Sequence, residues 1–349
     1  MPTKLNRAGN QQNYVPAGNG DASGEYGNHS GSNKHFTNFK KQDSAFDSAN
    51  KQRLGNNLSS QAKNVLEEKP ILKTPTTLDE WTETILTEER QKKGIVNVET
   101  RVDKTPIKQI DEKAIQDALK ESSKETVDKA INLIRKYEKS VDVTAKDLEN
   151  IADQMSGLMV GMGFRLKSLE STSRKLESYV IEERANGNKN FTLDDAVGKM
   201  RDVARFTMAF DEKNFEGSVK TVMDQLAKQG YKLVRAKNTF TEGANYKGLN
   251  CNFIDKQGNI FELQFHTPTS MKVKEGIEID MPNKSVVLNH SNITAHDIYE
   301  TTRKLEDKIR AGSVTKEEQM LYDNLMAEGK KRWGSVPNYK MEFLNQKST

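Results

Sequence analysis

In the segment 259–266, NIFELQFH, apolar and polar residues alternate from Phe261 to His266. With a period of two, its phenylalanines and Leu263 fall on one face, and Glu262, Gln264 and His266 fall on the other. This alternation predicts a strand with one face in a core. Solvent-facing strand residues are usually a mixture such as Thr, Lys and Glu, whereas here an acid, an amide and an imidazole follow one another. The polar face is therefore either a solvated surface or the floor of an active site.

The periodicity of the rest of the chain predicts a fold class. Helical spacing extends over 77–90, 111–139, 144–157, 168–185, 193–201, 215–229, 294–311 and 316–331, and strand patterns cover 202–210, 231–237, 248–255 and 259–266. The last two strands are joined by KQG, a connection typical of a hairpin. This order predicts an α+β fold in which a mixed, mostly antiparallel sheet of about five strands is flanked by helices.

Composition indicates that part of the chain lies outside this domain, since 34% of residues are hydrophobic and 30% are charged. Residues 1–62 are rich in Gly, Asn and Ser and lack periodicity, which predicts a disordered arm. Residues 63–110 read as a linker with one short helix, whose first turn holds Thr77 and Glu80 as a capping box. The domain itself is expected over 111–335, followed by a tail at 336–349.

Charge and cysteine content exclude several classes of protein. Lys and Arg number 54 against 50 Asp and Glu, and this small excess does not favour a general nucleic-acid binder. Cys251 is the one cysteine, which excludes an internal disulfide framework and a cysteine-based zinc site. The N-terminus lacks a signal-peptide pattern, and the run GLMVGMGF is too short to cross a bilayer. We expect a protein of the cytoplasm that has no contact with a membrane.

Basic residues gather in RLKSLESTSRKL, 165–176. Arg165 and Lys167 alternate as on an extended segment, and Ser171, Arg174 and Lys175 then share one face of the following helix. Guanidinium and ammonium groups near a helix N-terminus suit a triphosphate. The plain alternative is a solvated basic face paired with neighbouring glutamates, and the run taken alone favours that alternative.

Two acids flank the predicted strands. Asp202 opens the strand at 202–210, and Glu262 lies in the middle of the polar face. Two carboxylates on adjacent strands repel unless a cation lies between them, and Mg²⁺ bound by one or two carboxylates together with substrate phosphates is the usual arrangement. The alternative for either acid is a cross-strand partner for a Lys or Arg.

A polar loop, NTFTEGANYKGLN, separates two of the strands. Gly243 and Gly248 flank Tyr246, and Asn250 follows on an outward position. An exposed tyrosine in such a loop suits stacking on a nucleotide base. An ordinary loop aromatic that covers the edge of a core is the alternative.

Together these segments resemble the synthetase domain of the RelA/SpoT family of alarmone synthetases. The basic run is similar to that family's R-x-K-S-x-x-S-x-x-R-K motif, with matches at Arg165, Lys167, Ser168, Ser171, Arg174 and Lys175. RDVARF stands where the family has its Mg²⁺-binding Asp, which implies this role for Asp202 and a phosphate contact for Arg205. The resemblance also implies the family's nucleotidyltransferase-like fold.

The two later motifs correspond to the part of the family's site that binds the acceptor nucleotide. The resemblance as a whole covers about residues 120–310. NYKGLN stands in place of the family's nucleotide-stacking loop and implies that Tyr246 stacks on the acceptor base. FELQFHT is similar to E-V-Q-I-R-T, which implies Glu262 as the second Mg²⁺ ligand and Gln264 beside the acceptor hydroxyl. Each motif is weakly specific, but four in the family's order and spacing make a strong signal.

Two departures from the family bear on the acceptor. Asn250 stands where many members have His, and His266 replaces the usual Arg. These motifs look more like the small or toxin-type members, and the family's hydrolase and regulatory domains have no counterpart, which implies a synthesis-only enzyme in a bacterial host cytosol. The N-terminal arm is similar to leader segments of phage-encoded proteins. The acceptor stays open: GDP or GTP, giving (p)ppGpp, is the default, and an adenine nucleotide or a tRNA 3′ end is the alternative.

The implied reaction moves the β,γ-diphosphate of ATP to a purine nucleotide 3′-hydroxyl. The residues expected to hold ATP are Arg165, Lys167, Ser171, Arg174, Lys175 and Arg205, and those expected to contact the acceptor are Tyr246, Asn250, Lys237 and Arg235. Gln264 or Glu262 would orient or deprotonate the hydroxyl, and His266 would contribute through a charge that changes near neutral pH. The rival hypothesis is a non-catalytic phage or nucleic-acid-associated protein; oligomeric state and an immunity partner stay open.

Overall fold

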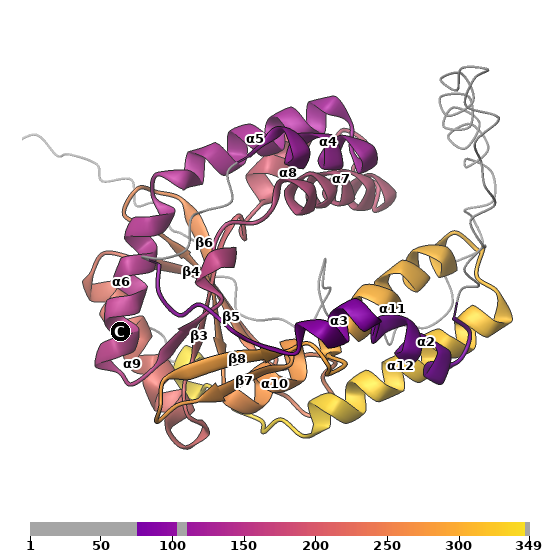
Figure 1. Ribbon diagram of the computed structural model, residues 1–349. Coiled ribbons are helices and arrows are strands. Elements are labelled where there is room, and N and C mark those ends of the chain that lie inside the picture. The colour runs from indigo at the N-terminus through magenta and orange to yellow at the C-terminus, as the bar shows by residue number, and fades with distance from the viewer. Residues whose placement is uncertain (1–74, 103–109, 346–349) are drawn as a thin grey trace, which may run out of the picture. The chain divides into compact units, whose positions relative to one another are not determined.

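Five strands form the central sheet of the computed structural model, in the order β2-β3-β6-β5-β4 (Figure 1). They are β2 Leu158–Val160, β3 Ala204–Ala209, β4 Lys232–Asn238, β5 Leu249–Ile254 and β6 Ile260–His266. Strands β3 and β6 run parallel, and the other three neighbouring pairs are antiparallel. The predicted α+β fold with a mixed, mostly antiparallel sheet is confirmed.

The structure describes residues 75–102 and 110–345, which belong to the unit Leu72–Thr349. The expected arm at 1–62, its leader-like segment and the first part of the expected linker lie outside the described residues. Within the described ranges, every helix is too short or too polar for a bilayer span.

The sheet has one apolar and one polar face, as the alternation in 259–266 predicts. Phe261, Leu263 and Phe265 are buried, whereas Glu262 and Gln264 are half-buried. Helix α6 (Val141–Gln154) packs on β2 and β3, and α9 (Phe215–Lys228) packs on β4. Tyr231 joins these layers, because its ring contacts Phe261 and its hydroxyl donates a hydrogen bond to Asp147 of α6 over 2.7 Å. The polar face of the sheet is therefore the place to look for a functional site.

A second group of helices precedes strand β3 in the sequence. It comprises α4 Glu112–Glu121, α5 Lys124–Glu138, α7 Leu169–Ala185 and α8 Leu193–Lys199. The single helix expected over 111–139 is wrong, because Ser123 caps a new helix by accepting a hydrogen bond from the Thr126 amide. The expected start after Thr144 is also wrong, since α6 begins at Val141 and Thr144 is buried within it.

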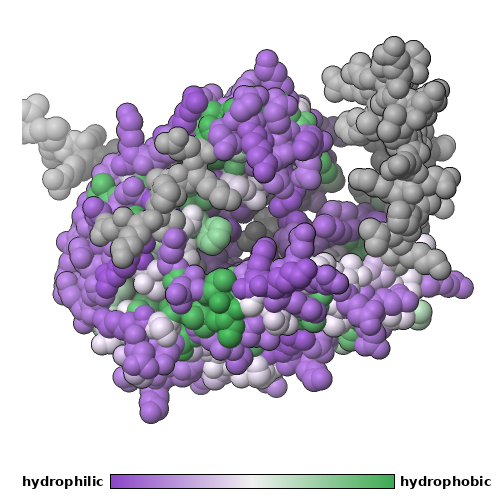
Figure 2. Space-filling model, in the orientation of Figure 1, coloured by the Kyte–Doolittle hydropathy of each residue, from purple (hydrophilic) through white to green (hydrophobic). Residues whose placement is uncertain are grey.

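A three-stranded sheet, β1-β8-β7, was not predicted. Its strands are β1 Ile95–Asn97, β7 Ile277–Asp280 and β8 Ser285–Asn289, and α10 (Pro268–Glu275) precedes β7. Strands of three to five residues are too short to establish a period. Side chains from this sheet and α10 pack against Val160 and Ala209 at the β2–β3 end of the central sheet. Figure 2 shows an apolar area over β8 on an otherwise mostly hydrophilic face.

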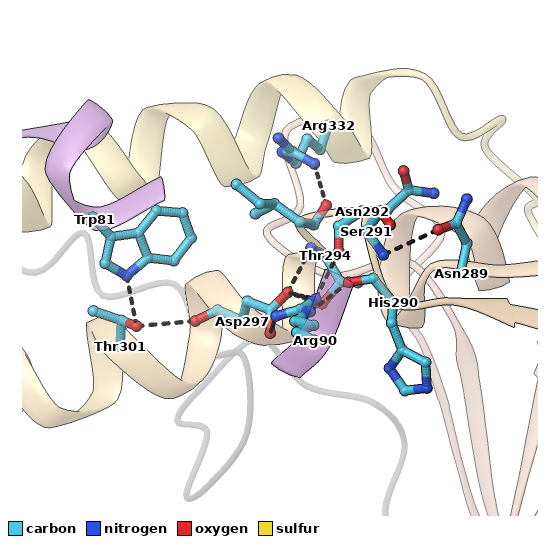
Figure 3. A network of polar contacts seen from close by, with 11 residues as sticks. Trp81, Arg90, Asn289, His290, Ser291, Asn292, Thr294, Asp297, Thr301 and Arg332 are labelled. Atoms are coloured by element: carbon cyan, nitrogen blue, oxygen red, sulfur yellow. Dashed lines mark hydrogen bonds and ion pairs between the residues drawn. The ribbon is translucent and has the colours of Figure 1, made fainter. Parts of the chain in front are cut away.

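The described part of the expected linker is built into the domain. It forms α2 (Leu78–Ile85), which has the predicted Thr77–Glu80 capping box, and α3 (Glu88–Lys93). Trp81 enters a core with α11 (Ala295–Arg310) and α12 (Lys316–Gly334). In Figure 3, the Arg90 guanidinium donates to both Asp297 carboxylate oxygens, at 3.0 and 2.8 Å, and to the carbonyls of His290 and Asn292. Residues 75–102 therefore belong to the packed domain and not to the linker that was expected over 63–110.

The expected tail at 336–349 is likewise part of the packed structure over its described residues. Val336 and Met341 are buried, and the Tyr339 ring contacts Phe215 and Phe240. Residues 75–102 and 110–345 also contain three short 3-10 helices, η3 Met162–Phe164, η4 Glu212–Asn214 and η5 Glu342–Asn345. The C-terminal boundary of the domain lies beyond the predicted residue 335.

Helix α7 depends on its cap. Ser168 is extended, and its hydroxyl accepts a hydrogen bond from the Ser171 amide over 3.2 Å. Replacing Ser168 with alanine is expected to lower the free energy of unfolding by about 1 kcal/mol, because the amide loses its acceptor. Ser168→Asn, whose side chain can still accept this bond, is the matched control and is expected to stay close to wild type in urea denaturation. Equal losses for both variants would contradict the role of the cap.

Candidate functional site

Polar side chains form two rows across four strands of the central sheet. The first row follows the pairs Arg205–Glu262, Glu262–Asn252 and Asn252–Arg235, and the second follows Thr207–Gln264, Gln264–Asn250 and Asn250–Lys237. Directly paired residues lie on the same face of a sheet. The floor thus brings together Glu262, Gln264, Arg205, Asn250, Lys237 and Arg235, which sequence reasoning selected one at a time, and adds Asn252 and Thr207.

The basic run and Asp202 meet at the entry to β3. Backbone hydrogen bonds of 2.9 Å run from the Lys167 amide to the Val203 carbonyl and from the Arg205 amide to the Arg165 carbonyl. These two bonds hold the start of the basic run alongside the start of β3. The Asp202 carboxylate oxygen Oδ2 then lies 3.2 Å from Lys167 Nζ and 2.8 Å from Lys175 Nζ.

This cluster of Lys167, Asp202 and Lys175, here called the lysine–aspartate cluster, is largely shielded from solvent. The Asp202 and Lys167 side chains are each 8% exposed. Burial alone would raise the pKa of Asp202, but the ammonium groups of Lys167 and Lys175 outweigh burial and lower this pKa to about 2. Asp202 is therefore a carboxylate at neutral pH, and it has the lysine partners that the plain alternative predicted.

The other residues of the basic run do not join the cluster. Arg165 is buried; its guanidinium donates to Asp142 over 2.7 Å and to the Met162 carbonyl over 2.9 Å. Arg174 is 41% exposed and lies 3.7 Å from Glu170. The Ser171 amide donates the hydrogen bond that the Ser168 hydroxyl accepts at the α7 cap. Lys167 and Lys175 thus meet at Asp202, whereas the Arg165 side chain is held by Asp142. The expectation that these groups converge on one phosphate chain stays a prediction.

Lys274 on α10 belongs to the floor and was missed from the sequence. Its ammonium group donates to Gln264 Oε1 over 2.9 Å, and Gln264 Nε2 donates to Glu262 Oε1 over 2.6 Å. This chain fixes the Gln264 amide and orients one oxygen of Glu262. The signals for α10 were present, since Thr267 caps it, Pro268 occupies its first turn and Gly276 ends it in a left-handed conformation.

Tyr246 and His266 occupy places that the sequence did not predict. Tyr246 is 3% exposed, packed edge-on against the Trp333 ring at 5.3 Å, so the expectation of an exposed stacking tyrosine is wrong for this structure. His266 is fully buried between the Tyr246 hydroxyl, 3.1 Å from Nε2, and the Ser270 hydroxyl, 2.9 Å from Nδ1. Trp333 from α12 covers the loop that holds Tyr246.

Burial holds His266 in its neutral form. It lowers the pKa of His266 well below 6.5, and the nearby Lys274 ammonium lowers it further. The expectation that its charge changes near neutral pH is therefore wrong, because the folded protein keeps the ring uncharged there.

The lowered pKa of His266 predicts a pH dependence of stability. Below about pH 6.5 the His266 ring binds a proton in the unfolded chain but not in the folded chain. The free energy of unfolding therefore falls as the pH drops from 7 to 5, with a slope of up to about 1.4 kcal/mol per pH unit. Urea denaturation at pH 7, 6 and 5 measures this slope. His266→Gln is expected to show a shallower slope than wild type, and identical slopes would contradict the assignment.

The donors present suit a magnesium ion that arrives with phosphates. Asp202 Oδ1 is buried without a hydrogen-bond partner among the described residues, and Glu262 lies on the next strand, paired with Arg205. Within the same ranges, no group of three or more His, Cys, Asp or Glu side chains forms a metal site. Mg²⁺ commonly uses one or two carboxylates and completes its shell with phosphate and water oxygens, which fits this pair.

Comparison with known proteins gives matches only at the level of solved structures. No family model matches the sequence, and no curated protein matches it. The Type VI effector Tas1, solved in complex with its immunity protein, is 19% identical over 60% of this chain and 95% of that chain, with a TM-score of 0.29. A GTP pyrophosphokinase family protein from Streptococcus pneumoniae is 15% identical over 56% and 84%, with a TM-score of 0.30. The small alarmone synthetase 1 from Bacillus subtilis, bound to pppGpp, is 13% identical over 58% and 88%, with a TM-score of 0.27. Similarities at this level assign neither a substrate nor a reaction to this chain.

Proposed function

We propose that this site carries out a magnesium-dependent transfer of the β,γ-diphosphate of ATP to the 3′-hydroxyl of a purine nucleotide. The observation that carries the proposal is the lysine–aspartate cluster at the entry to β3, the strand on which Arg205 pairs with Glu262. Cations for a triphosphate and one carboxylate for a metal thus lie at the entry to β3, and the second carboxylate, Glu262, lies on the adjacent strand β6.

The chemistry needs positioning and charge more than a covalent catalyst. The acceptor 3′-oxygen forms a bond to the β-phosphorus, the bond between that phosphorus and the α,β-bridging oxygen breaks, and AMP leaves. Lys167 and Lys175 would neutralise the phosphate chain once they exchange Asp202 for phosphate oxygens. Bound Mg²⁺, held by Asp202 and Glu262, would supply further charge neutralisation on the same phosphates.

The floor residues have roles on the acceptor side. The Glu262 carboxylate would take the proton of the attacking hydroxyl, and Gln264, fixed by Lys274, would orient that hydroxyl. Asn250, Lys237 and Arg235 follow on the neighbouring strands, where an amide and two cations suit the ribose and phosphates of the nucleotide. Arg165 and Arg174 would have to leave their carboxylate partners to contact ATP.

GDP or GTP is the acceptor that we propose first, with an adenine nucleotide or a tRNA 3′ end as alternatives. The toxin-type character of the motifs suggests that the product inhibits growth, and an immunity protein would then be the expected partner. The Tas1 complex is one solved precedent for such a pair.

The test is a transfer assay with a panel of acceptors. Purified full chain, Mg²⁺ and γ-labelled ATP would be incubated separately with GDP, GTP, ADP, AMP and bulk tRNA, and the products separated by thin-layer chromatography. Label moving to one acceptor would identify it. A folded protein that binds no ATP and moves no label would overturn the proposal and favour a non-catalytic scaffold.

A further inference from the structure

A chain of hydrogen bonds leads from the corner between β6 and α10 to the site floor. The Tyr246 hydroxyl donates to Asn250 Oδ1 over 3.0 Å and lies 3.1 Å from His266 Nε2, whose Nδ1 lies 2.9 Å from the Ser270 hydroxyl. Asn250 is the end of this chain that reaches the floor, since its strand pairs it with Gln264.

Gly248 lets the members of the chain meet. A Cβ atom at this position would lie 2.4 Å from the Tyr246 hydroxyl and 2.8 Å from His266 Cε1. No side chain fits there without displacing one of the two rings. The loop sequence YKGLN thus provides both the tyrosine and the space that it needs.

The direction of the chain follows from the bond between Tyr246 and Asn250. The one hydroxyl proton of Tyr246 is given to Asn250 Oδ1, so the Tyr246 oxygen accepts a proton from His266 Nε2. The neutral ring then has no proton on Nδ1. The Ser270 hydroxyl has two acceptors, Nδ1 at 2.9 Å and the Thr267 carbonyl at 3.0 Å, and in this direction its one proton goes to Nδ1. The Ser270 oxygen in turn accepts a hydrogen bond from the Thr267 amide over 2.9 Å.

The direction of the chain determines what Asn250 offers to a ligand. With Oδ1 occupied by Tyr246, the remaining group is the NH₂ of the amide, and among the described residues Nδ2 has no hydrogen-bond partner. We propose that Tyr246, His266 and Ser270 are positioning residues that hold Asn250 as a donor-only recognition group on the site floor. This inference rests on the proposed function for the identity of the ligand, a nucleotide that presents an oxygen or ring-nitrogen acceptor to Asn250, such as the O6 and N7 edge of guanine, in place of an amino group.

The direction of the chain is measurable on the wild-type protein. Nitrogen-15 spectra of the histidine-labelled full chain report the tautomer of each ring, and variants of the other four histidines assign His266. We expect a neutral ring with its proton on Nε2. A proton on Nδ1 would reverse the chain and overturn the proposal. This result does not depend on any transfer activity, so failure of the chain and failure of the proposed reaction are distinguishable.

The role of Tyr246 is measurable through the acceptor. Tyr246→Phe removes only the hydroxyl, and we expect KM for the acceptor nucleotide to rise roughly three- to tenfold, with kcat within about twofold. In an Asn250→Ala background the same change is expected to have no further effect, because Tyr246 acts through Asn250. Additive effects of the two substitutions would overturn the proposal.

Tyr231→Phe is the matched control. Tyr231 is also 3% exposed and donates one hydrogen bond to a carboxylate, but that bond joins α6 and lies outside the floor. It is expected to leave KM for the acceptor unchanged. An equal rise in KM for both tyrosine variants would mean that a loss of buried hydrogen bonds in general, and not this chain, weakens the site.

Discussion

Replacing Asp202 with asparagine is expected to lower the rate of diphosphate transfer by at least about a hundredfold. The change keeps the shape of the side chain and removes its charge, so the site loses a carboxylate that suits Mg²⁺. Steady-state transfer measured with the acceptor found in the panel assay checks this expectation. Asp194→Asn is the matched control, because Asp194 is an exposed aspartate in an ion pair with Lys129 on the helical part of the domain.

The same substitution is expected to have an opposite effect on phosphate binding without metal. In the wild-type protein, Lys167 and Lys175 are both engaged by Asp202. Removing this charge takes one carboxylate away from the two ammonium groups and makes the cluster more positive, so calorimetry should show tighter binding of inorganic tripolyphosphate in the presence of a chelator. Unchanged or weaker binding, or full transfer activity, would contradict the assignment of the cluster.

The stability of the Asp202→Asn variant has to be measured alongside its activity and its phosphate binding. Removing one partner of a buried ion pair generally costs about 3–5 kcal/mol, because a buried charge is left without compensation. Activity and binding are therefore compared at a temperature at which circular dichroism shows both proteins folded.

Replacing Glu262 with glutamine is expected to lower kcat by about 10²–10⁴-fold with a smaller change in the KM for ATP. The new amide oxygen can still accept the hydrogen bond from Gln264, so the floor keeps its shape, but the group no longer takes a proton. Glu278→Gln is the matched control: Glu278 is also a strand glutamate, in β7 of the other sheet, and pairs with Lys272 over 3.1 Å. Loss of activity in both variants would indicate a general effect of removing strand charges.

The fold was predictable where a long period or a cap marked it. The alternation in 259–266 predicted strand β6 and its two faces, and the Thr77–Glu80 capping box predicted the start of α2. The small sheet could not be predicted, because its strands are short and are stabilised by pairing with segments far away in the sequence, as β1 pairs with β8.

The site was predictable to the extent that its residues lie on regular elements. Glu262 and Gln264 follow from the strand period, but the burial of Tyr246 depends on Trp333, and the direction of Arg165 depends on Asp142. These contacts join distant segments and leave no local pattern. His266 shows the limit most clearly, since the period places it on the polar face, while contacts with Tyr246 and Ser270 place it in the interior.

The central claim is that a diphosphate moves as one unit, and the by-product of ATP tests it most directly. The full chain would be incubated with Mg²⁺, the preferred acceptor and ATP labelled at either the β- or the γ-phosphate, and the nucleotides followed over time. Our account predicts that both labels enter the same product and that AMP forms in equal amount. Release of ADP with only the γ-label transferred, or no consumption of ATP by the folded protein, would contradict it.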